Sequence, residues 1–169
     1  QPLTGFIKVD GKVYRVIGSE SRAFANIAAT ADEQPYMVKF TETEPADGWQ
    51  NETFNDTKWK SGKAPFSDNK TTAGTRWATK DIWVRRTFNV NNPEVNKAFL
   101  KIIHDDNTEV YLNGKEIYNY KGWLGKFQYI PLDDLKSKLK KGKNVLAIHV
   151  ANTAGGAYLD AGIVYEPPV

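Results

Sequence analysis

The chain has 169 residues, a net charge of +3 and an apolar fraction of 40%, which are the values of one globular domain with an ordinary core. So balanced a charge excludes the basic surface of a typical nucleic-acid-binding protein, and no run approaches the ~18 apolar residues of a membrane-spanning helix. The absence of cysteine excludes thiolate metal sites, disulfide frameworks and cysteine nucleophiles together.

Residues 1–30 differ in pattern from the rest of the chain. Between Phe6 and Gly18, two alternating runs are joined by Asp10-Gly11, a dipeptide that suits the positive φ of a hairpin turn. Residues 19–30 are small and rich in alanine, a composition compatible with a short helix or an irregular connector. We therefore expect residues 1–30 to be a hairpin and connector at the end of a preceding region, and residues 31–169 to form the main domain.

From residue 36 onward, short apolar or alternating runs are separated by turn signals, which is the pattern of β-strands. The strands are predicted at 36–40, 81–90, 98–103, 108–112, 115–118, 128–132, 144–151 and 157–165. Asn113-Gly114 predicts a tight hairpin turn, and the acidic start and basic end of 133–139 favour a single helical turn. Strands of this length with so little helix predict an all-β sandwich.

Three segments of this sequence resemble, in the same order, parts of a known fold. They are DIWVRRTF at 81–88, DDNTEVYLNGK at 105–115 and LKKGKNVLAIHV at 139–150. They are similar to the W-R-R-x-F strand, the x-V-Y-L-N-G hairpin and the G-x-N-x-L-A strand of the galactose-binding-like jelly roll, notably the sugar-binding domain of glycoside hydrolase family two enzymes. The resemblance covers roughly residues 35–165. It implies a non-catalytic jelly-roll β-sandwich, because the acid/base pair of those enzymes lies in a separate barrel.

The first residues carry a second resemblance. PLTG at 2–5 and VDGKVYR at 9–15 are similar to a segment near the start of large secreted glutaminase-like proteins of gut Bacteroidetes. This resemblance implies a piece of a longer bacterial protein that is secreted, periplasmic or displayed on the outer surface. The partners it implies are a carbohydrate or the neighbouring catalytic domain of the same chain; the sequence indicates no nucleic acid and no membrane span.

Tryptophan side chains are the first candidates for carbohydrate binding, because an indole face stacks on the apolar face of a pyranose. Trp59 and Trp83 lie in strand-like or turn-anchoring contexts and are expected to be packed within the domain. Trp49, Trp77 and Trp123 lie in or beside predicted loops, where binding residues concentrate. Trp123, between two glycines, is the strongest of the three; the alternative is that its ring pins a long loop to the sandwich.

The acidic loop 104–107 supplies the polar candidates. Asp105 and Asp106 are adjacent, so they make a poor glycosidic dyad, which needs two carboxyl groups facing each other roughly 5–10 Å apart. They are candidates for hydrogen bonds to sugar hydroxyls, for caps on backbone N–H groups, or, with Asn107, for a weak Ca²⁺ site. His104 borders this loop, and Asn152 ends the strand that holds the only other histidine, His149, which is expected to be satisfied and partly buried.

The sequence therefore predicts a non-catalytic accessory domain of a larger secreted enzyme, with no catalytic residue and no obligatory cofactor. The main hypothesis is carbohydrate binding through loops at one end of the sandwich. The alternative is a scaffold that packs on a glutaminase-like or glycosidase catalytic domain without binding sugar. The candidate binding residues are Trp123, Asp105, Asp106, Asn152, Trp77, Trp49 and His104.

Overall fold

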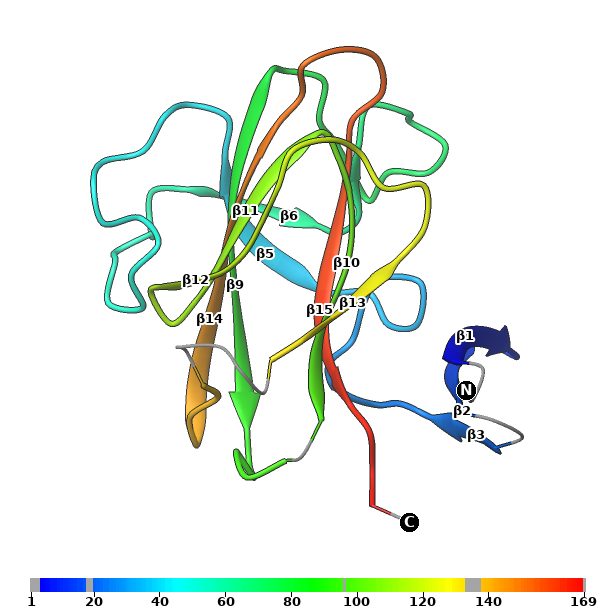
Figure 1. The fold of residues 1–169 in the computed structure, drawn as a ribbon. Helices are drawn as coiled ribbons and strands as arrows, with labels where there is room; N and C mark the ends of the chain where they lie inside the picture. The colour runs from blue at the N-terminus through cyan, green and yellow to red at the C-terminus, as the bar shows by residue number, and fades with distance from the viewer. Residues whose placement is uncertain (1–3, 18–19, 96, 133–137, 169) are drawn as a thin grey trace.

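The fold is an all-β sandwich, as the sequence predicts (Figure 1). The computed structural model describes residues 4–17, 20–95, 97–132 and 138–168, and contains no helix within them. The helical turn predicted over 133–139 falls mostly outside the described residues. Two six-stranded sheets face each other, and a three-stranded sheet formed by the first strands stands beside them.

The first large sheet has the strand order β12-β11-β14-β9-β5-β6, with every pair antiparallel. Its strands are β5 (Met37–Thr41), β6 (Lys60–Lys63), β9 (Asp81–Val90), β11 (Asn107–Leu112), β12 (Lys115–Tyr120) and β14 (Gly142–Ala151). Its two longest strands, β9 and β14, are neighbours paired along their whole length. They are the two central strands of this sheet.

The second large sheet has the order β13-β10-β15-β7-β8, and β4 also pairs with β15. Its strands are β4 (Ala25–Ala28), β7 (Phe66–Ser67), β8 (Thr75–Arg76), β10 (Ala98–Asp105), β13 (Gln128–Pro131) and β15 (Tyr158–Tyr165). The core lies between the two sheets, and both contribute to it. Its largest fully buried apolar side chains are Phe66, Trp77, Ile82, Leu100, Ile102, Leu112, Leu146 and Ile163.

The small sheet joins β1 (Thr4–Val9), β2 (Lys12–Ile17) and β3 (Glu20–Ala23). The hairpin predicted at Asp10-Gly11 is present, with φ values of 50° and 78° at the turn. The ring of Phe6 stacks on Tyr129 of the second large sheet at 4.3 Å between centroids, and Phe24 completes the cluster at 5.2 Å from Tyr129. The small sheet is therefore attached to the sandwich through aromatic contacts.

Residues 20–28 correct one expectation. They form strands β3 and β4, not the helix or irregular connector that their alanine content allows. The reason is tertiary: β4 pairs with the C-terminal part of β15, although it precedes residue 31. The close approach depends on Gly162, where a Cβ atom would lie 2.2 Å from the carbonyl oxygen of Ala28. Small residues on both strands permit this contact, and no local sequence pattern predicts it.

The Asn-Gly hairpin also has a tertiary role. Asn113 and Gly114 have φ values of 49° and 86°, as a two-residue turn requires. The Asn113 side chain accepts a hydrogen bond from the Val145 N–H at 2.9 Å and donates one to the buried Asn144 at 2.9 Å. Asn144 in turn donates to the carbonyl groups of Lys140 and Gly142. These two asparagines lie within the segments that resemble the galactose-binding-like jelly roll. Their hydrogen bonds hold the hairpin against β14.

Arg85 on β9 organises the loop before Trp59. Its guanidinium is 3% exposed and donates to the carboxylate of Asp56 at 2.9 Å and to the carbonyl groups of Trp49 and Asn51. It also lies over the Phe54 ring, 5.3 Å from the centroid. A planar fork with several donors suits this set of acceptors, whereas a lysine ammonium presents a point charge. One buried cation thus holds residues 49–56 of the connection between β5 and β6.

Substitution Arg85→Lys is expected to lower the free energy of unfolding by about 2–4 kcal/mol, because backbone carbonyl groups lose donors and Asp56 loses the hydrogen bond from Arg85 Nε. Chemical denaturation measures this loss, and limited proteolysis should show new cuts between residues 47 and 58. The exposed Arg76→Lys is the matched control and is expected to stay within ~0.5 kcal/mol of the parent. Equal stability of the two variants would contradict this role for Arg85.

Asp160 lies in a second buried network, which links the sheets. Its carboxylate accepts hydrogen bonds from the Tyr36 hydroxyl at 2.7 Å and from the Ala31 N–H at 2.9 Å. Arg86, on the core face of β9, stacks over the Tyr36 ring at 3.4 Å and donates to the Ala161 carbonyl at 2.7 Å. Burial raises the pKa of Asp160 from 3.8 to about 6, although its hydrogen bonds act in the opposite direction.

This raised pKa predicts a pH dependence of stability. Between pH 4 and pH 6 the folded state holds a proton that the unfolded state has released, so the contribution of Asp160 falls as pH rises through this window, by at most ~3 kcal/mol. Substitution Asp160→Asn keeps an acceptor and removes the titration. The difference in unfolding free energy between parent and variant should therefore change between pH 4 and pH 6, and a difference that stays constant would refute the assignment.

Candidate binding site at the β10–β11 corner

The candidate site is the corner at which the chain passes from one large sheet to the other. Strand β10 ends at Asp105 in the second sheet, and β11 begins at Asn107 in the first. The loops 120–127 and 152–157 lie at the same end of the sandwich (Figure 1). The structure therefore brings together the acidic loop, the loop of Trp123 and the loop of Asn152, as the sequence-based hypothesis requires.

Asp106 holds the loop that follows β14. Its Oδ2 atom accepts hydrogen bonds from the N–H and hydroxyl of Thr153, both at 2.9 Å, and from the Ala154 N–H at 3.2 Å. Burial alone would raise the pKa of Asp106, but hydrogen bonds from Asp105, Thr153 and Ala154 outweigh it and lower the pKa. The residue is 7% exposed, so its carboxylate caps backbone groups and does not face a ligand.

Asn107 has a similar role on the other side of the corner, where its Oδ1 atom accepts the Gly122 N–H at 2.8 Å. The oxygens proposed as weak calcium ligands on Asp106 and Asn107 therefore already face N–H donors. Among the described residues, no group of three or more histidine, aspartate and glutamate side chains is placed to hold a metal ion. The geometry at this corner favours the backbone-capping alternative over a calcium site.

Asp105 is the partly exposed carboxyl group of the corner. Burial, the hydrogen bond to Asp106 and the negative charges of Asp106 and Asp68 together raise its pKa to about 7. A Cβ atom at Gly156 would lie 3.7 Å from Asp68 and 3.8 Å from Asp105, so the two carboxyl groups flank this glycine. Asp105 and Asp106 share a hydrogen bond and do not face each other across a gap, an arrangement suited to binding and not to glycosidic acid/base chemistry.

Two predicted binding residues are wrong because their side chains are buried. Trp77 is 1% exposed and belongs to the core. It directly follows β8, and the pairing of β8 with β7 places this part of the chain in the second large sheet. His104 is fully buried, and its ring contacts the Asp106 carbonyl at 2.7 Å and the Tyr118 hydroxyl at 2.8 Å. Burial lowers the pKa of His104 and disfavours its charged form. Neither ring has a free face for a sugar.

Trp49 lies elsewhere on the sandwich. Its ring meets Tyr111 edge-on at 5.6 Å over the outer face of the first sheet, and its carbonyl accepts from Arg85. The same outer face holds His149, which bridges Glu109 at 3.0 Å and Asp81 at 2.8 Å and stacks on Trp83. His149 is therefore satisfied and partly buried, as predicted, and Trp49 does not join the corner.

Two large aromatic side chains are accessible at the corner. Trp123 is 65% exposed and Tyr120 is 45% exposed. The Leu124 N–H donates to the His104 carbonyl at 2.8 Å, which holds the Trp123 loop against β10, and the Tyr120 ring lies 5.8 Å from the His104 ring. Sequence reasoning missed Tyr120, which is the last residue of β12, two positions before Gly122. We call Tyr120 and Trp123 the aromatic surface.

Asn152 shapes the neighbouring loop and is not directed freely to solvent. Its N–H donates to the Lys80 carbonyl at 2.7 Å, and its side-chain amide donates to the Gly155 carbonyl at 3.1 Å. The side-chain oxygen of Asn152 is buried without a hydrogen-bond partner among the described residues. The loop is thus held by contacts of Asn152 and of the Asp106 carboxylate.

Within the described part of the chain, no helix has the length and apolar character needed to span a membrane.

Comparison with known proteins identifies the class of fold. Solved structures with similar folds include a Bacteroides uniformis β-glucuronidase (19% identity, TM-score 0.59) and a glycosyl hydrolase family 2 member from Bacteroides cellulosilyticus (16%, 0.56). A Ruminococcus gnavus β-glucuronidase is also similar (18%, 0.56). No family model and no curated protein sequence matches the chain.

The extent of these matches is as informative as their names. The three alignments cover 79%, 81% and 84% of this chain, but only 18%, 20% and 29% of the enzymes. At these identities the likeness is one of fold. The chain therefore has the fold of one domain within larger glycosidases, which confirms the sandwich implied by its sequence motifs.

Substitution Asp106→Ala is expected to release the 152–156 loop, because two N–H groups and one hydroxyl lose their shared acceptor. Hydrogen exchange at Thr153 and Ala154 should accelerate at least about tenfold, while exchange in the middle of β14 stays unchanged. The exposed Asp47→Ala is the control for loss of a surface carboxylate. Unchanged exchange at Thr153 would mean that the loop is held without Asp106.

Proposed function

We propose that the chain is a non-catalytic, carbohydrate-binding accessory domain of a larger glycosidase. The observation that carries the proposal is the aromatic surface, in which Tyr120 and Trp123 expose large rings on an anchored end of the sandwich. Both rings are accessible at the same corner, and a sugar ring offers a matching apolar face. Asp105, adjacent to the buried His104, supplies a hydrogen-bonding group at the same corner.

The similarity to glycosidase structures supports a glycosidase as the parent enzyme, since the fold recurs there as a fraction of longer chains. The glutaminase-like origin and the export from the cytoplasm implied by residues 2–15 stay predictions. A binding surface on a non-catalytic domain would raise the local concentration of polysaccharide at the catalytic part.

The scaffold hypothesis has one observation in its favour. On β1, Ile7 and Val9 are 47% and 50% exposed and lie on the face of the strand opposite to Phe6, which stacks on Tyr129. An apolar strand face of this kind is suited to contact with another part of a longer protein. Scaffold and binding functions use different parts of the domain, so the experiments below separate them.

Substitution Trp123→Ala is expected to weaken binding to a responsive oligosaccharide about tenfold or more, since burial of an aromatic face is worth ~1.5–3 kcal/mol. The measurement is intrinsic fluorescence and calorimetry with cellotetraose, mannotetraose and tetragalacturonate. Because the ring is largely exposed, the free energy of unfolding should change by no more than ~0.5 kcal/mol.

The exposed Met37→Ala, on β5, controls for the loss of an apolar side chain elsewhere, and Trp123→Phe should retain part of the affinity. Saturable binding that is identical in the parent and in Trp123→Ala would overturn the aromatic surface as the site. No binding to any tetrasaccharide of the panel would favour the scaffold hypothesis.

A further inference from the structure

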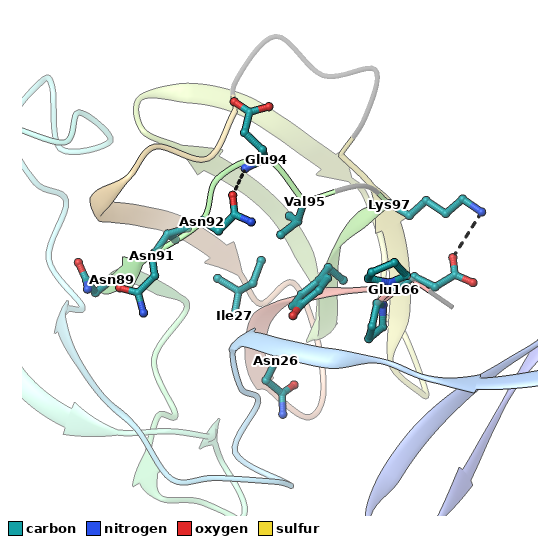
Figure 2. A pocket seen from close by; sticks show the side chains of 13 residues that line it. Asn26, Ile27, Asn89, Asn91, Asn92, Glu94, Val95, Lys97 and Glu166 are labelled. Atoms are coloured by element: carbon teal, nitrogen blue, oxygen red, sulfur yellow. Dashed lines mark hydrogen bonds and ion pairs between the residues drawn. The ribbon is translucent and has the colours of Figure 1, made fainter.

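A cavity of about 670 Å³ lies at the other end of the sandwich (Figure 2). Strand pairing places it there: Asp105 pairs with Tyr158 at the corner, whereas Ala98 pairs with Tyr165 beside the cavity. The volume is in the usual range of small-ligand sites, roughly 300–1,000 Å³. Segments from β4, the end of β9, the connection to β10 and the end of β15 line it.

The polar lining of the cavity consists mainly of asparagine amides. Asn26, Asn89, Asn91 and Asn92 all line it, and Figure 2 shows the last three along one side. Asn92 accepts the Glu94 N–H at 3.0 Å. Asn26, Asn89 and Asn91 are exposed, and within the described residues their side-chain amides make no hydrogen bond to another protein group. Each amide offers two donors and an acceptor without carrying charge, so a ligand can use both kinds of group.

The rest of the lining is apolar. Ile27 lies in the middle of the view in Figure 2, with Val95 nearby, and Tyr165 and two prolines complete this part of the wall. An apolar wall beside uncharged amides matches a molecule that has a C–H face and several hydroxyl groups. A pyranose has both features.

The charged groups of the cavity argue against an anionic ligand. Glu94 and Glu166 both line it, and the one lysine, Lys97, has its ammonium 3.8 Å from the Glu166 carboxylate. The lysine charge is thus already partly balanced, which leaves an excess of negative charge. A uronate or sulfated sugar would meet repulsion here, whereas a neutral sugar would not.

We propose that this cavity is a second binding site, for a neutral saccharide unit, distinct from the aromatic surface at the corner. The proposal stands on the amide-lined cavity itself and does not require a ligand at Trp123. If both sites are occupied, the domain contacts polysaccharide at two opposite ends, and the two weak sites act together on one chain or on neighbouring chains.

The experiment uses the 169-residue chain labelled with ¹⁵N and titrated with cellotetraose, mannotetraose and tetragalacturonate. The side-chain amide signals of Asn26, Asn89 and Asn91 report directly on the cavity. We expect them to shift with at least one neutral tetrasaccharide. The double substitution Asn89→Ala and Asn91→Ala should weaken that binding about tenfold or more, because it removes two unpaired amides from the site.

Three comparisons make the result specific. Asn119→Ala is the matched control, because that exposed amide already donates to Glu116 at 2.8 Å. Trp123→Ala should leave the shifts of the cavity amides unchanged. Absence of binding at the aromatic surface is therefore distinguishable from absence of binding in the cavity. Thermal melting of the double variant confirms that it is folded.

The proposal is overturned if no neutral tetrasaccharide shifts the cavity amides at millimolar concentration, or if the double variant binds as tightly as the parent. Tighter binding of tetragalacturonate than of the neutral sugars at these amides would overturn the assignment of a neutral ligand.

Discussion

The structure depends on the burial of two consecutive arginines on opposite faces of β9. A buried guanidinium is costly unless acceptors surround it, so each of these residues dictates the position of other segments. Arg86 points into the core, where the Tyr36 ring and the Ala161 carbonyl receive it. Arg85 points outward and gathers three backbone carbonyls and Asp56 around itself. The two arginines therefore have structural roles. Through them, β9 contacts the opposite sheet on one side and an irregular loop on the other.

The same principle explains how the loops of the corner are held together. Its polar side chains, above all those of Asp106 and Asn107, are used to hold the backbone of two loops that approach from different parts of the chain. Side chains that carry out this work are buried and unavailable to a ligand. The aromatic surface and the partly exposed Asp105 stay accessible, and the backbone hydrogen bond between Leu124 and His104 holds the Trp123 loop. The residues that hold the loops are therefore different from the residues that are accessible to a ligand.

The two ends of the sandwich differ in chemistry. At the corner, exposed aromatic rings stand beside acidic groups, one of which has its pKa raised to about 7 by burial and by its acidic neighbours. At the other end, uncharged amides, three charged side chains and an apolar wall line a cavity. Stacking tolerates many sugars, whereas a cavity of defined volume with amide donors and acceptors discriminates by shape. An accessory domain with one site of each kind would combine broad attachment with selectivity.

The sequence by itself determined the longer strands of the sandwich, the two hairpin turns and the class of fold. Alternation along 81–90, the Asn-Gly and Asp-Gly turns and the apolar run of β14 are local signals, because each follows from backbone geometry and from which face of a strand is buried. Only the tertiary structure decided which polar and aromatic residues are accessible. Trp77 and His104 lie in stretches typical of loops and are buried, Tyr120 at the end of a strand is exposed, and the alanine-rich segment became β4 because Gly162 leaves room for it. These outcomes depend on contacts between residues far apart in the chain, and such contacts leave no periodic trace in the sequence.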